Sequence, residues 1–194
     1  NIGNGYMLGL GLNTNKNLSK YFSIGANGNY WFKAKEFNYG GNLDFNIIPS
    51  KDMRLRISAS HQFERLGNYG FEEKKNILNP SGYKHFYIKA TSLNDMISAE
   101  YSTYINQYLK GFVRFEVGDK IVFNSQQLNA NSQQPYRLST LDFKLRIAFG
   151  EDFIKSENVL KSEGNANPVI WLSYQKNLRD VFSCPYNFDK IEFL

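Results

Sequence analysis

Three successive runs of alternating apolar and polar residues, at residues 22–33, 37–47 and 53–64, constrain the fold of this chain most. In each run, aromatic or aliphatic side chains take most alternate positions, and Asn, Ser, Gly or charged residues take the others. A strand sends successive side chains to opposite faces, whereas a helix would scatter these apolar residues around its circumference. The runs therefore predict amphipathic β-strands, each close to the roughly 9–11 residues that a tilted strand needs to cross a bilayer.

The same alternation continues through most of the chain, and it is clearest at residues 138–150. Further strands are predicted at residues 2–12, 83–91, 96–104, 111–118, 168–175 and 186–194. The predicted connections are turns at 35–36 and 49–52, a break at 92–95, and loops at 13–20, 64–82, 119–137 and 151–167. The loop at 119–137 is rich in Asn and Gln and fits a disordered insertion equally well. About ten strands without a convincing helix predict an all-β fold of antiparallel up-and-down strands, in a single region over residues 1–194.

Composition narrows the architecture to two classes. Aromatic residues make up 16% of the chain, yet its mean hydropathy is −0.48. An outer-membrane β-barrel with a wet lumen gives this combination, and so does a soluble β-sandwich with one solvated face. No run of 18 apolar residues exists, which excludes a membrane-spanning helix. The length of the strands favours the barrel, because sandwich strands are usually about 5–6 residues long and closure removes exposed sheet edges.

A membrane barrel would give each face of these strands a role. The residues predicted to face lipid are Phe22, Ile24, Tyr30, Phe32, Leu43, Phe45, Leu55, Ile57, Phe143, Leu145 and Ile147. The charges predicted to face the lumen are Arg54, Arg56, Asp142, Lys144 and Arg146, for which mutually neutralising surface charges are an equal alternative. The predicted interface aromatics are Trp31, Tyr39, Trp171 and Tyr174, although any β-protein concentrates aromatic residues in its strands.

Motifs for catalysis, metals or nucleic acids are not found. The net charge of +5 comes from dispersed Lys and Arg residues, so nucleic-acid binding is not predicted. Neither His61 nor His85 has the spacing of a metal ligand, and the chain lacks nucleophile and phosphate-binding motifs. Cys184 is alone, which forbids an internal disulfide and fits a buried or pore-lining thiol. The sequence therefore predicts a protein that is not an enzyme and holds no cofactor or metal.

Six short motifs follow one another in an order that resembles one known family. They read LSKYF, FKAKEFNYGGNLDF, LRISASHQFERLGNYG, LSTLDFKLRIAFGEDFI, NPVIWLSYQKNL and YNFDKIEF. Together they make residues 1–194 similar to the barrel part of a Bacteroidetes outer-membrane family of unknown function. Members of that family carry a carboxypeptidase-regulatory-like domain before the barrel, and the barrel resembles the BamA and TamA assembly barrels. This chain departs from the family pattern at residues 3–5 and in the Asn/Gln-rich stretch 124–134.

The resemblance implies a location, partners and a function. It implies the outer membrane of a Gram-negative bacterium, with outer-membrane lipid and other envelope proteins or assembly-complex subunits as partners. The implied role is non-enzymatic, in insertion or export of envelope proteins. It also implies that this chain is an incomplete portion of a barrel that continues beyond Leu194 and follows a periplasmic domain. The alternatives are a barrel that transports a solute or glycan, and a soluble β-sandwich or lipocalin-like binding protein.

Overall fold

The computed structural model describes residues 6–14, 19, 21–32, 35–65, 91–123, 135–156, 159–165 and 167–194. In this part of the chain the secondary structure is eleven β-strands and two short 3-10 turns. The strands are β1 Met7–Asn13, β2 Phe22–Trp31, β3 Glu36–Ile48, β4 Met53–Arg65, β5 Thr91–Tyr104, β6 Leu109–Phe123, β7 Tyr136–Ala148, β8 Glu151–Ser156, β9 Val159–Asn165, β10 Val169–Asn177 and β11 Asp189–Phe193. The 3-10 turns are η1 Pro49–Lys51 and η3 Val181–Ser183. Neither turn has the length or the apolar character that a membrane-spanning helix requires.

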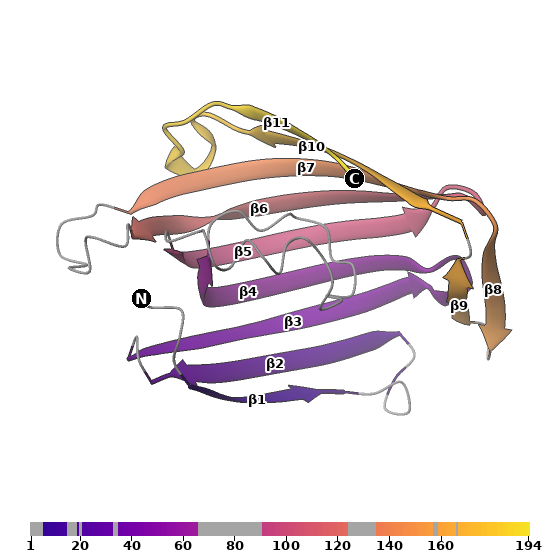
Figure 1. The fold of residues 1–194 in the computed structure, drawn as a ribbon, viewed down its shortest axis with the longest axis horizontal. Helices are drawn as coiled ribbons and strands as arrows, with labels where there is room; N and C mark the ends of the chain where they lie inside the picture. Colours follow the sequence, from indigo (N-terminus) through magenta and orange to yellow (C-terminus); the bar gives the residue numbers. More distant parts are fainter. Residues whose placement is uncertain are drawn as a thin grey trace.

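Nine of these strands form one antiparallel sheet in the order β1-β2-β3-β4-β5-β6-β7-β10-β11. Each strand pairs with its neighbour in sequence, except that the β8–β9 hairpin is inserted between β7 and β10. Figure 1 shows the strands side by side, from β1 at the bottom to β11 at the top. The prediction of an all-β, antiparallel, up-and-down fold is confirmed. The described sheet is open, with β1 and β11 at its two edges, as expected for part of a barrel.

The strands connect differently at the two ends of the sheet. At one end, on the right of Figure 1, lie η1, the tight turn at residues 105–108 and the β8–β9 hairpin, and we call this the turn end. At the other end, which we call the loop end, β2, β4, β6 and β10 finish. The predicted turn at residues 49–52 is confirmed: Pro49 begins η1, and Asp52 closes it in the left-handed region at φ 48°. The Asp52 amide donates to the Pro49 carbonyl over 3.3 Å.

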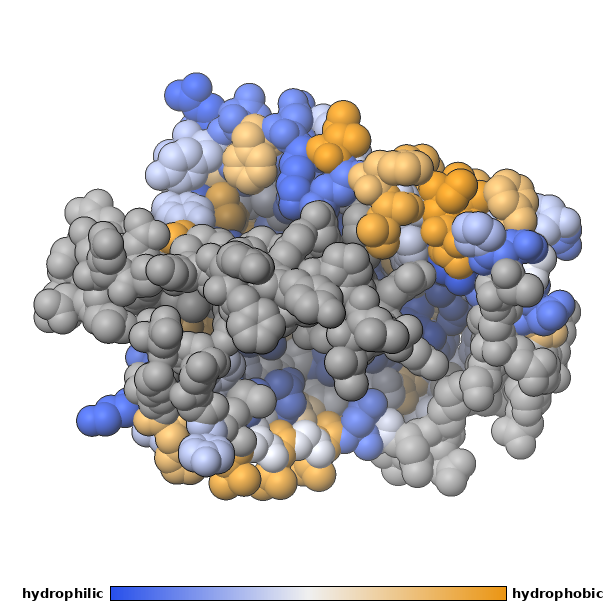
Figure 2. Space-filling model, in the orientation of Figure 1, coloured by the Kyte–Doolittle hydropathy of each residue, from blue (hydrophilic) through white to orange (hydrophobic). Residues whose placement is uncertain are grey.

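Burial in the sheet is the reverse of that in a soluble protein. On β3 the polar residues Asn38 and Asp44 are 5% and 8% exposed, whereas Phe37 and Phe45 are 53% and 42% exposed. Among the described residues, only Ala148 and Cys184 are buried apolar side chains. Figure 2 shows apolar residues gathered along the lower margin, where β1 lies, and at the upper right. A soluble protein buries its apolar side chains. In this sheet the polar face is the buried one and the apolar face is the exposed one.

Several strands are longer than the sequence predicts. The predicted break at 92–95 is wrong, since β5 runs through it and Asp95 pairs with Asp119 across the ladder. The predicted loop at 119–137 is also too long, because β6 continues to Phe123 and β7 begins at Tyr136. The predicted loop at 151–167 contains the β8–β9 hairpin. In each case cross-strand pairing holds polar residues in strands that their local propensity does not favour. The strand predicted at 83–91 lies outside the described residues apart from Thr91.

Candidate functional site

A row of charged side chains crosses the polar face of the sheet. Each of the strands β3 to β7 contributes one charge to it, and the sign alternates from strand to strand. In register order the members are Asp44, Arg56, Glu100, Arg114 and Asp142, followed by Gln175 and Lys190 on β10 and β11, and we call them the charged row. Residues directly opposite each other in an antiparallel pair have Cβ atoms about 4.5–5.5 Å apart, so each neighbouring pair from Asp44 to Asp142 brings opposite charges together.

Asp44 is the most fully bonded member of the charged row. Arg56 Nε donates to Asp44 Oδ1 over 2.5 Å. Asn42 Nδ2 and Ser23 Oγ donate to Asp44 Oδ2 over 2.9 and 3.4 Å. Both carboxylate oxygens therefore have partners from β2, β3 and β4. These bonds fix the register of three strands through a group that is almost fully buried.

Hydroxyl groups line the polar face beside the charged row. Ser58 and Ser98 lie opposite each other on β4 and β5, with their Oγ atoms 2.8 Å apart. In the described part of the chain, the buried atoms Ser92 Oγ, Thr140 Oγ1 and Asp142 Oδ1 have no hydrogen-bond partner from the protein. Because buried polar atoms in native proteins are bonded to protein or to water, these atoms favour a hydrated space over this face.

At the turn end, a second group of charges lies on the same face. Arg146 Nη1 and Nη2 donate to the two carboxylate oxygens of Glu151 over 2.6 and 3.0 Å. Asp52 accepts a bond of 2.9 Å from Arg54 Nη2 and is also paired with Lys110. We call these five residues the turn-end cluster. Arg146 and Glu151 join β7 to the start of β8, and Asp52 joins the end of η1 to β4 and β6.

Two aromatic rings pack beside the turn-end cluster on the polar face. The rings of Phe112 and Trp171 have centroids 5.7 Å apart, and the Arg146 guanidinium carbon lies 6.0 Å from the Trp171 centroid. On the start of β8, Phe153 packs edge-on against Tyr104 at 5.1 Å. The polar face is therefore charged in its middle and aromatic at the turn end.

The five charges named from the sequence all lie on the polar face. Arg56 and Asp142 belong to the charged row, and Arg54 and Arg146 belong to the turn-end cluster. Lys144 lies between these two groups, opposite Ser173 and Phe112. Their assignment to a lumen stays a prediction. Sequence reasoning missed Asp44, Glu100 and Arg114 as site residues. Each of them occupies a polar position in the alternation of its own strand, and this was the one sign in the sequence that it faces the same way as the predicted charges. That they form a row follows only from the register of all five strands.

The residues predicted to face lipid lie on the opposite face. Those that are exposed are Phe22, Ile24, Tyr30, Phe32, Leu43, Phe45, Ile57, Phe143 and Leu145, and those that are partly exposed are Leu55 and Ile147. Of the four predicted interface aromatics, Tyr39 and Tyr174 are on this apolar face as well. Trp31 and Trp171 have the phase of the polar face, and Trp171 contacts Phe112 there. Only the two tyrosines therefore have the orientation that an outward-facing aromatic girdle requires.

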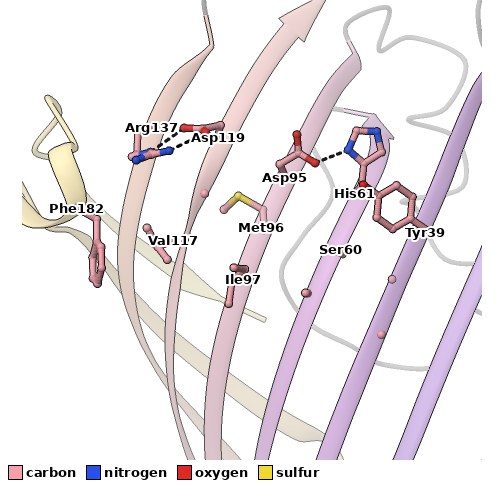
Figure 3. A pocket seen from close by; sticks show the side chains of 14 residues that line it. Tyr39, Ser60, His61, Asp95, Met96, Ile97, Val117, Asp119, Arg137 and Phe182 are labelled. Carbon is pink, nitrogen blue, oxygen red and sulfur yellow. Dashed lines mark hydrogen bonds and ion pairs between the residues drawn. The ribbon is translucent and has the colours of Figure 1, made fainter.

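One polar row interrupts the apolar face near the loop end. In register order it consists of Tyr39, His61, Asp95, Asp119 and Arg137, and we call it the outer polar row. His61 is stacked on Tyr39 with centroids 4.9 Å apart, and its Nδ1 is paired with Asp95. Arg137 donates to both oxygens of Asp119, over 2.8 and 2.9 Å. Figure 3 shows these side chains along one side of a groove of about 600 Å³.

Within the described residues, no three His, Cys, Asp or Glu side chains lie close enough together to hold a metal ion. Cys184 is buried, with 1% of its surface exposed, and accepts a hydrogen bond of 3.1 Å from Asn177 Nδ2. The described sheet has two different surfaces, a charged polar face and an apolar face with one polar row.

Comparison with known proteins identifies the family of the chain. No curated protein and no solved structure matches it. Residues 1–194 match the model of a family of unknown function, described as the DUF5686 C-terminal domain. The match covers every strand described above, so the charged row and the apolar face both lie within the family's domain. The chain therefore belongs to the DUF5686 family, of which it is a C-terminal domain.

Proposed function

We propose that this chain forms part of the wall of an outer-membrane β-barrel, with the apolar face toward lipid and the charged row toward the lumen. The observation that carries the proposal is the reversed burial of the sheet, in which Asp44 is 8% exposed and the neighbouring Phe45 is 42% exposed. Contact between an apolar outer face and lipid costs no hydrophobic free energy, whereas contact between that face and water is unfavourable. A hydrated lumen likewise accommodates charges that an apolar core would exclude.

The dimensions of the strands support a membrane-spanning wall. β3, β4 and β7 each have 13 residues. At about 3.4 Å per residue and a tilt of about 40°, such a strand rises about 34 Å, which exceeds the apolar band of about 25 Å in outer-membrane barrels. On β3 the apolar phase extends from Ile47 back to Gly41, followed by Tyr39 of the outer polar row and then by the exposed Phe37. We place one boundary of the bilayer near the outer polar row, with Phe37 just beyond it.

The proposed role is non-enzymatic insertion or export of envelope proteins, in the outer membrane of a Bacteroidetes bacterium. It rests on the similarity of six ordered motifs to a family whose barrel resembles the BamA and TamA assembly barrels. In the described sheet β1 is an edge strand, and its Leu8, Leu10 and Leu12 are 70%, 85% and 81% exposed. An edge of this kind offers backbone groups to a client strand.

A transport barrel is the second candidate, and the charged row favours it. Its alternating signs leave little net charge along the row, as expected for a wall that passes or holds a polar, uncharged molecule such as a glycan. In this role the partner would be a solute, and the open edge at β1 would pair within the barrel. A soluble sandwich or lipocalin-like binder finds less support, because the exposed apolar face would have to be covered by another protein.

Extraction tests the membrane assignment. Protein purified from membranes should need detergent to stay dispersed, and it should migrate faster in gel electrophoresis before boiling than after it. Both results are expected because a closed barrel resists unfolding by detergent until it is heated. Monodisperse protein in plain buffer would contradict the assignment.

Depletion in cells separates assembly from transport. If the protein acts in assembly, its depletion should lower the abundance of many outer-membrane proteins together. If it acts in transport, uptake of one class of solute should fall while the other outer-membrane proteins keep their abundance. The first result would contradict the transport candidate, and the second would contradict the assembly role.

A further inference from the structure

The groove beside the outer polar row is a shallow site on the apolar face. Its floor is made by small residues, since Gly41 and Ala59 face outward opposite each other on β3 and β4. Next in register are Ile97 and Val117, which form the far wall of the groove. A Cβ atom added to Gly41 would meet only the Gly25 carbonyl oxygen, at the ordinary contact distance of 3.4 Å. The site is hollow because side chains are missing there, not because the backbone is distorted.

The polar rim of this groove combines both signs of charge. Asp95 and Asp119 lie opposite each other on β5 and β6, and their side chains are 56% and 39% exposed. His61 pairs with the first carboxylate, and Arg137, with 46% of its side chain exposed, pairs with the second. Asp119 has the Arg137 guanidinium as its partner, whereas Asp95 has, among the described residues, only the His61 imidazole, so a ligand cation beside Asp95 would be favourable. Arg137 binds Asp119 through Nε and Nη2, which leaves its remaining N–H groups for an anion that the same ligand carries.

We infer that this groove binds a zwitterionic phospholipid with a primary ammonium, of the phosphatidylethanolamine type. The ammonium would lie beside Asp95 and Asp119, and the phosphate would take N–H groups of Arg137 that do not bind Asp119. One acyl chain would run from the rim along the hollow over Gly41 and Ala59. The inference rests on the proposed function, because the groove meets lipid only if this face lies in a membrane.

The head group follows from the chemistry of the rim. A primary ammonium donates up to three hydrogen bonds, which matches two adjacent carboxylates. The trimethylammonium of phosphatidylcholine has the same charge but no N–H group. Phosphatidylglycerol has the phosphate but no cation, so its head group would add no positive charge beside the two carboxylates. The site should therefore prefer phosphatidylethanolamine over both.

Native mass spectrometry of the detergent-solubilised protein measures this preference directly. The protein is titrated separately with palmitoyl-oleoyl phosphatidylethanolamine, phosphatidylcholine and phosphatidylglycerol. The expected affinity for phosphatidylethanolamine is about tenfold higher than for the other two, the effect of one lost charged hydrogen bond. Asp95→Asn and Arg137→Gln should each remove most of the preference.

A pair of matched variants separates the groove from the rest of the apolar face. Ala59→Leu fills the hollow and should weaken phosphatidylethanolamine binding about tenfold. Ala99→Leu makes the same change on the same face, one row nearer the turn end and outside the groove, and should leave binding unchanged. Both variants keep the face apolar, so both should still fold and show heat-modifiable migration.

The outcomes distinguish this inference from the proposed function. Equal affinity for the three lipids, or equal effects of Ala59→Leu and Ala99→Leu, would overturn the lipid site and leave the barrel standing. Protein that is monodisperse without detergent would overturn the barrel itself. A preference that disappears in Ala59→Leu and in Asp95→Asn, but not in Ala99→Leu, is the result that the inference requires.

Discussion

Arg56 and Asp44 face each other across the β3–β4 ladder, and Arg56 Nε donates to Asp44 Oδ1 over 2.5 Å. The Asp44 side chain is 11% exposed and that of Arg56 is 35% exposed. The pair forms one end of the charged row, and Glu100 lies opposite Arg56 on the next strand, β5. Loss of Arg56 therefore leaves a nearly buried carboxylate with only neutral donors, while Glu100 loses its neighbour of opposite sign.

Arg56→Gln should lower the free energy of unfolding by about 1–3 kcal/mol, because Asp44 keeps its desolvation cost without its charged partner. Urea titration of the protein in detergent measures this change. Arg179→Gln is the matched control, since Arg179 is 69% exposed and pairs only at 3.7 Å with the exposed Asp180. Equal stability of the two variants would show that the charged row does not hold the sheet together.

Glu151→Gln should loosen the β8–β9 hairpin. The Glu151 side chain is 1% exposed and binds the Arg146 guanidinium with both oxygens. An amide in its place keeps one acceptor and adds an N–H group that faces a cation, so a loss of about 1–3 kcal/mol is expected. Limited proteolysis should cut between β7 and β10 sooner than in the wild type. Asp152→Asn, which changes the exposed neighbour, should leave the cutting rate unchanged, and faster cutting in both variants would contradict the role of the ion pair.

Asn177 should protect the single thiol. Its Nδ2 donates to Cys184 Sγ over 3.1 Å and to the Tyr186 carbonyl over 2.8 Å, and its Oδ1 accepts from the Ser139 amide over 3.2 Å. Asn177→Ala removes these bonds from a fully buried position, so iodoacetamide should label Cys184 faster than in the wild type. Asn187→Ala, at an exposed position in the same connection, serves as the control. Rapid labelling of the wild-type thiol would contradict the burial of Cys184.

Neighbouring positions on β7 should respond oppositely to substitution. Leu145 lies on the apolar face and Lys144 on the polar face. Leu145→Arg should cost about 2–4 kcal/mol if the residue lies near the middle of the bilayer, whereas Lys144→Gln should be mild. Unfolding of the protein in lipid vesicles measures both effects. Equal tolerance at the two positions would contradict the assigned faces.

The period-two alternation was sufficient to predict the fold and the two faces of the sheet. The sequence of a single strand already separates residues such as Phe45 from Asp44, so its two faces can be assigned without knowledge of its neighbours. Strand ends were less predictable. Asp95 and Asp119 are poor strand formers, and they extend β5 and β6 because cross-strand partners stabilise them there.

The two rows were not predictable from the sequence. Asp44 and Asp142 are far apart along the chain, and their place in one row depends on the registers of all the strands from β3 to β7. The outer polar row is still harder to foresee, because Arg137 falls in a segment whose local composition indicates a loop. Residues that act through register across several strands leave only a weak local signal.

Spin labels along one strand test the central claim most directly. Single cysteines at positions 141 to 146, in a Cys184→Ser background, carry a nitroxide label in protein reconstituted into lipid vesicles. Collision rates are measured with oxygen, which concentrates in the bilayer, and with a water-soluble nickel chelate. Labels at 141, 143 and 145 should collide mainly with oxygen and those at 142, 144 and 146 should not, giving a period of two. A uniform profile, or oxygen collisions highest at the even positions, would contradict a wall with its apolar face in lipid.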